Sequence, residues 1–191
     1  MAARHSAGDA HRLTKTPSVP SILSHPAVPL GLAAAAGTRV IPPGLALAAC
    51  AASVLPDADS LGFAMGIPYG SFFGHRGFTH SFFFATVVAA VATAFSSRFG
   101  ASKAVVFAVV FVSAVSHGLL DAMTTGGMGV ALLSPFSNRR YFLPWHVIRV
   151  SPIGIAPFFS RWGLRVLASE VVWVWIPAMA VGALGFLIRR R

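Results

Sequence analysis

The feature that most constrains this chain is its series of long apolar runs, which are separated by short breaks rich in glycine, proline and polar residues. Only 10% of the residues are charged and 55% are hydrophobic, and the mean hydropathy is +0.73. A soluble domain carries about 25% charged residues, so this chain cannot cover an ordinary globular surface with polar groups. The sequence therefore predicts an all-α, polytopic membrane bundle of about four to five helices in one domain.

Breaks in hydropathy place the helices. The predicted segments are about Pro26 to Ala36, Gly44 to Leu55, Phe78 to Phe95, Ala104 to Met123 and Val166 to Ile188. The first two measure only ~18 Å, less than a hydrocarbon core of ~30 Å, so they could be re-entrant, tilted or packed inside the bundle. Pro177 predicts a kink in the last helix. Residues 1–24 are basic and are expected to form a disordered cytoplasmic tail, with residues 25–191 forming the membrane domain.

Histidine and aspartate residues stand at the ends of four of these segments. If successive helices cross the membrane in alternate directions, the starts of odd helices and the ends of even helices meet on one side. All the residues concerned are then expected to gather at one membrane face. They are His25, Asp57, Asp59, His75, His80, His117 and Asp121.

The net charge of +10 resides mainly in the connections between apolar runs. That distribution fits the positive-inside rule and attraction to anionic headgroups better than a nucleic-acid groove, so no nucleic acid is expected as a partner. Nine basic residues on the side of the polar cluster, against six on the other, favour a cytoplasmic site. The terminal Arg189 to Arg191 oppose this orientation unless the last helix does not cross fully.

Spacing within the polar segments suggests ligands for a metal. His117 and Asp121 are four residues apart and share one helix face. Asp57 and Asp59 have no lysine nearby, and a divalent cation would relieve their repulsion. Simpler alternatives are a His–Asp hydrogen bond that joins two helices and a solvated Asp-rich turn. In HRGFTHS, Gly77 would permit a sharp turn between the two histidines.

Other residues of HRGFTHS have less specific interpretations. Thr79 or Ser81 is expected to act as a helix cap. Arg76 could hold a carboxylate, bind a phosphate or lie among headgroups.

The complete set of nitrogen and oxygen donors predicts one or two divalent metals, with zinc the first choice and manganese or iron also compatible. A catalytic zinc would lower the pKa of a bound water to about 7 and so supply hydroxide. Asp59 could then act as a general base or orient a histidine ligand. Arg76, with Arg139 and Arg140 if the long connection folds back, could neutralise an anionic transition state.

The order LPDAD, HRGFTHS, SHGLLDAMTTGG and LLSPFSNRRYFLPW resembles the membrane-bound metal-dependent hydrolases, also called YdjM-like or LexA-regulated inner-membrane hydrolases. The likeness covers about residues 25–160. It implies a bacterial or archaeal inner-membrane hydrolase, distantly related to the all-helical zinc phospholipase C and single-strand nuclease scaffold. The resemblance implies metal binding by the motif positions His75, His80, Asp57, His117 and Asp121. His25 matches less closely, because SHPAV differs from the usual form.

These observations lead to two hypotheses. The first is an integral membrane metal-dependent hydrolase that uses a metal-bound hydroxide on a phosphoester, such as a lipid or lipid-linked headgroup. The alternative is a non-enzymatic membrane protein, whether sensor, transporter or scaffold, with a structural metal or His–Asp cluster. A transporter usually carries polar residues near mid-span or in paired repeats, and this chain shows neither pattern.

Overall fold

The computed structural model of the chain describes residues 18–19, 22–152 and 160–191. Its main helices are α1 (Ala27–Ala36), α2 (Pro43–Val54), α3 (Phe82–Ala94), α5 (Lys103–Ala122), α7 (Arg161–Glu170) and α8 (Ile176–Arg189). Shorter elements are the 3₁₀ helices η1 (Leu55–Phe63) and η2 (Phe78–His80), the single turn α4 (Ser96–Phe99) and the π turn η3 (Val171–Trp175). Within the described residues the predicted all-α bundle is confirmed, since the strands β1 (Ser18–Val19) and β2 (Ser151–Pro152) have two residues each.

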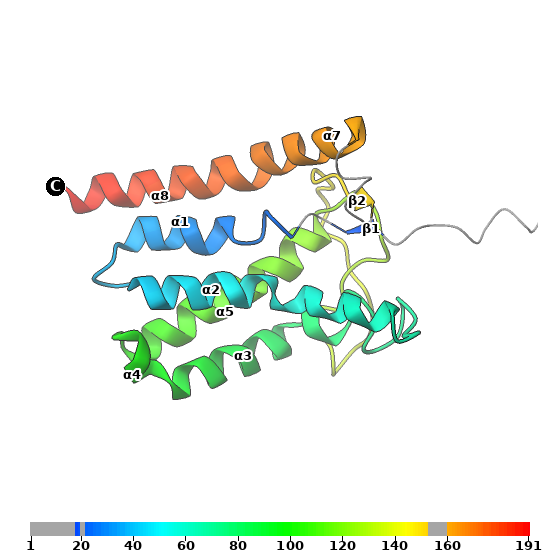
Figure 1. The fold of residues 1–191 in the computed structure, drawn as a ribbon, viewed down its shortest axis with the longest axis horizontal. Coiled ribbons are helices and arrows are strands. Elements are labelled where there is room, and N and C mark those ends of the chain that lie inside the picture. The colour runs from blue at the N-terminus through cyan, green and yellow to red at the C-terminus, as the bar shows by residue number, and fades with distance from the viewer. Residues whose placement is uncertain (1–17, 20–21, 153–159) are drawn as a thin grey trace, which may run out of the picture.

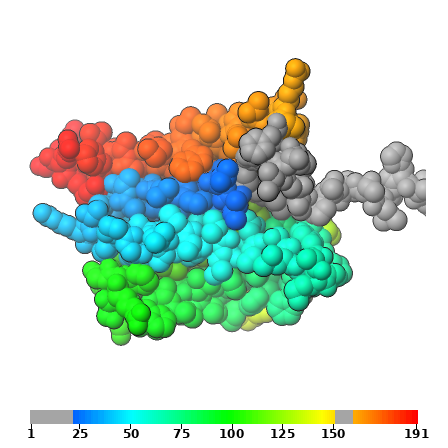
Figure 2. Space-filling model, viewed as in Figure 1, coloured from blue at the N-terminus to red at the C-terminus, as the bar shows by residue number. Residues whose placement is uncertain are grey.

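Helix α5 holds the bundle together. It packs against α2, α3 and α1, and α1 in turn packs along α8 (Figure 1). One apolar core lies between α2, α3 and α5, around Leu45, Ala89, Val106 and Val110, all of which are at most 1% exposed. The α1 and α8 surfaces lie against one another along one side of the molecule (Figure 2). The predicted helix order is therefore realised as a single layered bundle.

Three helical runs are long and apolar enough to cross a membrane: Pro43–Phe63, Lys103–Ala122 and Arg161–Arg189. The second predicted helix is thus longer than expected. Its α-helical part ends at Val54, but η1 extends it to a total of ~36 Å. The third is shorter than expected, because the chain is extended at Ser81 and α3 has only 13 residues. Many large apolar side chains outside the core are exposed, including Leu47 (73%) and Leu184 (61%), as lipid-facing residues are.

The last helical run continues through Pro177 and does not end there. Proline has no amide hydrogen to donate, and a π turn, in which Ile176 N–H donates to Val171 O, comes directly before it. The break in regular α-helix predicted at Pro177 takes this form. At its far end, the Arg189 guanidinium donates to Ala34 O at 3.0 Å, so α8 reaches the end of α1 opposite to His25.

The predicted disordered tail, residues 1–24, lies largely outside the described residues. Its described part has defined structure. Ser18 and Val19 pair with Pro152 and Ser151, and the buried Ser24 hydroxyl donates to Glu170 at 2.7 Å. The structured domain therefore begins earlier in the chain than residue 25, because these contacts tie the segment before α1 to α7 and β2.

Small residues allow α1 and α8 to approach closely. A Cβ atom on Gly31 would lie 2.5 Å from the carbonyl oxygen of Ala178, and one on Gly182 would lie 3.0 Å from Ala34 Cβ. Such contacts are typical of packing between membrane helices, where close approach supplies dispersion energy that lipid does not.

We expect Gly31→Leu to destabilise the protein, because the new side chain collides with the backbone of α8 and forces the two helices apart. Overpacking of this kind costs about 1–3 kcal/mol. The measurement is the thermal unfolding midpoint in detergent. Gly44→Ala is the matched control, because a Cβ on Gly44 meets nothing within 4 Å. An equal midpoint for Gly31→Leu and Gly44→Ala would contradict the packing described.

Candidate metal site

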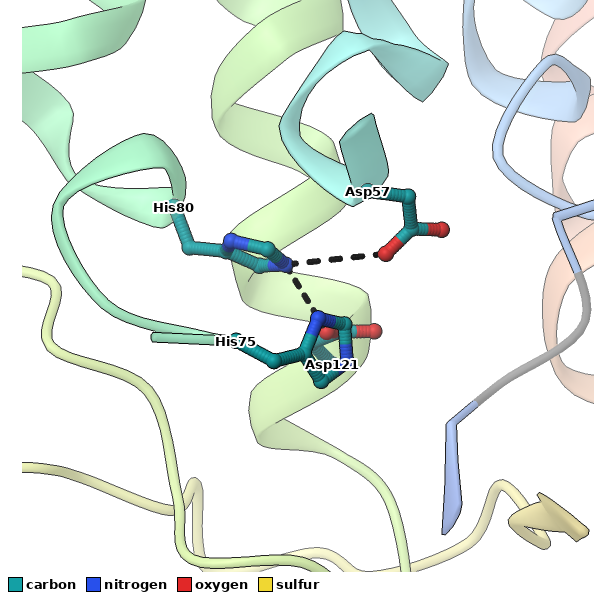
Figure 3. Close-up of side chains that lie close together, drawn as sticks. All are labelled: Asp57, His75, His80 and Asp121. Atoms are coloured by element: carbon teal, nitrogen blue, oxygen red, sulfur yellow. Dashed lines mark ion pairs between the residues drawn. The ribbon is translucent and has the colours of Figure 1, made fainter. Parts of the chain in front are cut away.

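Four chain segments meet at one end of the bundle. The residues before α1, the start of η1, the η2 turn and the end of α5 each contribute histidine or aspartate side chains, and these converge as the helix order predicts. Figure 3 shows four of them, Asp57, His75, His80 and Asp121. All seven predicted residues lie in this cluster, as their mutual contacts show. His25, His75, His117 and Asp121 are at most 1% exposed.

The two aspartates of LPDAD lie in a helix, beyond the predicted end of the second segment at Leu55, and not in a solvated turn. Pro56 ends the α-helix but lies in the first turn of η1, a position that tolerates a missing amide hydrogen. Asp57 and Asp59 follow within this 3₁₀ helix, on its side facing the cluster. Their positions are therefore fixed by a regular backbone that continues the axis of a membrane span.

The HRGFTHS segment turns sharply at Arg76, not at Gly77. Arg76 is in the left-handed region with φ 60°, which is uncommon for a residue other than glycine. Gly77 has a different role, because a Cβ there would collide with the carbonyl oxygen of Phe72. Ser81 caps α3, as predicted, by accepting from Phe84 N–H at 3.1 Å. The expectation of a cap is wrong for Thr79, whose hydroxyl donates to Asp59 at 2.6 Å.

One group of potential ligands comprises Asp57, His75, His80 and Asp121 (Figure 3). Each residue offers one potential metal-ligand atom, and these atoms lie within 4.8 Å of one another. His80 Nε2 is 3.3 Å from Asp121 Oδ2 and 3.8 Å from Asp57 Oδ1. Ligands at 2.0–2.1 Å from a tetrahedral ion are separated by about 3.3 Å, so these spacings suit a common cation.

A second group shares Asp121 with the first and adds His25 and His117. The rings of the two histidines stack with centroids 3.8 Å apart. His117 Nδ1 lies 2.7 Å from the carbonyl oxygen of Ser53, which can only accept, so Nδ1 carries the hydrogen. In the neutral ring, Nε2 is then an unprotonated donor to a metal, and it points at His80 Nε2, 3.0 Å away.

Asp59 lies one layer behind these groups. One of its oxygens is 2.6 Å from His75 Nδ1 and the other is 3.2 Å from His80 Nδ1. A carboxylate that accepts from Nδ1 fixes the tautomer and leaves Nε2 free to bind a metal. Of the two roles predicted for Asp59, this geometry matches the orientation of histidine ligands.

Arg76 is completely buried and contacts Asp121, with Nε 3.0 Å from the carboxylate. Its Nη1 donates to Thr124 Oγ1 at 3.1 Å and to Gly126 O at 2.9 Å. Of the interpretations left open by the sequence, the structure shows the one in which Arg76 holds a carboxylate. Removing either charge would leave the other buried without compensation, which costs several kcal/mol.

Several polar atoms of the cluster are buried without a hydrogen-bond partner. They are both ring nitrogens of His25, Nε2 of His75, Oδ1 of Asp57 and both carboxylate oxygens of Asp121. Buried polar atoms are normally satisfied, so a set of unsatisfied donors and acceptors at one place requires an explanation. Imidazole nitrogen and carboxylate oxygen without thiolate are the donors that zinc, manganese and iron accept. The residues present therefore fit a divalent cation.

Electrostatics within the cluster also favour positive charge. Burial alone would lower the pKa of His80, but the carboxylates of Asp121, Asp57 and Asp59 outweigh it and hold this pKa well above its usual value. Burial, helped by His117, lowers the pKa of His25 to about 3, so the His25 ring is neutral. One of its ring nitrogens then carries a hydrogen and the other has a free lone pair. Positive charge is thus favoured where His80 meets the carboxylates.

Sequence reasoning did not identify two residues around the cluster, Tyr69 and Ser53. Tyr69 packs edge-on against His75, with ring centroids 5.3 Å apart, and its buried hydroxyl has no hydrogen-bond partner. Arg140 does fold back, as the sequence allows, but it donates to carbonyl oxygens of His75, Tyr69, Ser71 and Gly129 and so stabilises the loop. Ser53 contributes only its carbonyl, which no side-chain pattern reveals. Arg139 is exposed and stacks over Tyr141.

Fold and site together define a polytopic membrane protein that carries a buried His–Asp cluster at one end of its helices. The chain belongs to the YdjM inner membrane protein family, whose model matches residues 21–191. It is 44% identical over 174 residues to inner membrane protein YbcI of Escherichia coli (strain K12), covering 91% of this chain and 99% of that protein. No solved structure matches the chain. The family confirms an inner-membrane protein and the resemblance inferred from the sequence motifs.

We expect Asp59→Asn to lower the affinity for zinc by about 10–100-fold, the usual effect of losing a partner that orients a ligand histidine. The substitution keeps the shape of the side chain but removes the charge that fixes His75 and His80. The affinity is measured by competition with a chelating dye. Ser60→Ala, at an exposed neighbouring position of η1, is the control. An unchanged affinity for Asp59→Asn would show that Asp59 does not orient the ligands.

Proposed function

We propose that this protein is a membrane-embedded, metal-dependent hydrolase that acts on a phosphoester, such as a lipid or lipid-linked headgroup. The observation that carries the proposal is the set of unsatisfied nitrogen and oxygen atoms in two adjoining groups that share Asp121. Binding of the divalent cation, most consistent with zinc, would supply an acidic water and a Lewis acid at neutral pH.

The residues of the chain then have distinct roles. Asp57, His75, His80, His117, Asp121 and His25 would hold the cation or cations. Asp59 orients His75 and His80, and Arg76 fixes the carboxylate of Asp121. Asp57 is the most accessible of the three carboxylates, with 11% of its side chain exposed against 2% for Asp59. A substrate phosphate would therefore approach from the Asp57 side, because the other carboxylates are covered by protein.

Tyr69 supports phosphoester chemistry in particular. Burial raises the pKa of its hydroxyl, which therefore stays protonated and able to donate. A Cβ placed on Gly127 would lie 3.0 Å from this hydroxyl and 2.6 Å from Arg76 Nη1, whose hydrogens go to Thr124 and Gly126, so we consider Tyr69 alone as the donor. A hydroxyl donor beside a cation site suits an oxygen of a phosphoryl group.

The rival function is a structural metal or His–Asp cluster in a sensor, scaffold or transporter. A structural site is closed by protein ligands, whereas a catalytic site keeps a position for water. The partial exposure of Asp57 favours an open site.

We expect the purified protein to contain near-stoichiometric zinc and to hydrolyse a phosphodiester in a chelator-sensitive reaction. His80→Ala and Asp121→Ala should lose the metal, as measured by elemental analysis, together with any activity. His146→Ala is the matched control, because His146 is exposed and lies outside the cluster. Full metal retention in both cluster variants would refute the site. Bound metal without hydrolysis of phosphodiester or phospholipid substrates would favour the structural rival.

We further propose that the cluster faces the cytoplasm, as the excess of basic residues on its side suggests. Arg76 and Arg140 bond within the protein, and Arg189 places the C-terminal arginines on the opposite side. The excess of basic residues on the side of the cluster therefore depends strongly on Arg4, Arg12 and Lys15, which precede the described residues.

In a Cys50→Ala background, we expect Ser60→Cys to be protected from a membrane-impermeant thiol reagent added to spheroplasts and to react in inverted vesicles. Ser60 is exposed beside the cluster, and Ser97→Cys, exposed at the opposite end, should show the reverse pattern. Labelling of Ser60→Cys in spheroplasts would place the site outside the cytoplasm.

A further inference from the structure

A groove on the lipid-facing side of the bundle adjoins the His–Asp cluster. It has a volume of about 250 Å³. One wall is formed by α1, a second by the continuous run of η3 and α8, and a third by Leu120 of α5. Its lining is almost entirely apolar and includes Val28, Trp173, Pro177 and Val181. Trp173 and Val181 are 50% and 52% exposed, so the groove is continuous with the surface that faces the bilayer.

The groove begins next to the stacked histidines of the cluster. Val28 lies three residues after His25, and Leu120 lies three residues after His117 on the same face of α5. The rings of His25 and His117 are 3.8 Å apart. Two residues of the groove wall therefore lie three positions along the chain from candidate metal ligands.

From that end, the groove runs toward the membrane interior. Trp173 and Val181 are eight residues apart on a helix that leads away from the cluster, which corresponds to about 12 Å. This is less than half of a hydrocarbon core of ~30 Å. A groove of this depth can take the upper part of one hydrocarbon chain.

Charge at the mouth indicates the kind of lipid. α7, which leads directly into the groove, carries Arg161 and Arg165, and both are exposed. Arg149 lies over the ring of Trp162 at 5.5 Å, at the same end of the molecule. Juxtamembrane arginines of this kind attract anionic headgroups.

We propose that this groove binds one acyl chain of an anionic membrane phospholipid, with the headgroup of that lipid at the end of the bundle that carries the His–Asp cluster. Insofar as it names the substrate class, this inference rests on the proposed function; as a lipid-binding site it stands independently. The bilayer supplies the ligand laterally, because the groove opens toward lipid. No movement of the helices is needed for entry.

The test is binding of phosphatidylglycerol to the full-length protein in detergent, measured by native mass spectrometry with didecanoyl and dihexanoyl chains. We expect the longer chain to bind more tightly to the unaltered protein. Val181→Trp fills the deep end of the groove and should weaken didecanoyl binding about tenfold, the effect of excluding roughly two methylene groups. Dihexanoyl binding should change little.

Met179→Trp is the matched control, because Met179 is on the same helix and is exposed but does not line the groove. Equal didecanoyl binding by Val181→Trp and the unaltered protein would overturn the proposal. So would an altered oligomeric state in Val181→Trp with unchanged lipid binding, since the groove would then be a contact between copies of this chain.

A second measurement does not depend on the tryptophan variant. Phosphatidylglycerol with a photoreactive diazirine in its acyl chain should label peptides that contain Val28 or Trp173 to Val181. Asp57→Asn should keep this labelling, because Asp57 does not line the groove. Labelling spread evenly over all helices would refute the site. Specific labelling without hydrolysis would refute the proposed hydrolase and leave the lipid groove standing.

Discussion

The structure depends on the burial of one carboxylate, that of Asp121, at the end of a membrane span. A buried charge costs several kcal/mol unless it is paired and hydrogen-bonded. Arg76 provides the pairing at 3.0 Å and is itself held by Thr124 and Gly126, which follow α5. To reach this position, Arg76 adopts φ 60°, a strained backbone for an arginine. The end of α5, the connection after it and the HRGFTHS turn are thus fixed to one another by a single ion pair.

Around this pair, the cluster is organised in two layers with different tasks. The inner nitrogens and oxygens are unsatisfied and face one another, whereas Asp59 and the Ser53 carbonyl accept from the Nδ1 atoms of the histidines. The outer layer selects the tautomers that leave Nε2 available. The unsatisfied atoms of the inner layer are the ones that the proposed cation would bind. The walls of the apolar groove include Val28 and Leu120, each three residues along the chain from a histidine of this polar centre.

Much of the fold and of the cluster could be predicted from the sequence because membrane helices are recognised as long runs of high hydropathy. The five helical segments and the gathering of seven His and Asp residues at one end follow from run lengths and alternating direction. Local geometry could not be read in the same way. The α-helix ends at Val54 but continues as η1 through Asp57 and Asp59, since Pro56 fits a first turn as well as a loop. Thr79 donates to Asp59, not to a helix end, because the η2 turn brings Asp59 within reach.

The sequence by itself determined the class of protein and the composition of the site. Its low content of charged residues requires lipid as the solvent, and three of its five acidic residues stand, like several histidines, at the ends of apolar segments. Only the tertiary structure decided which residues orient histidine ligands and which would bind a metal. Asp57 and Asp59 have the same side chain and differ only in the groups that they face. The tertiary structure also decided the place of the groove, which forms where α1, α5 and α8 meet. Contacts between residues sixteen or more positions apart leave no periodic trace in a single sequence, so the sequence could neither decide between the two roles predicted for Asp59 nor place the groove.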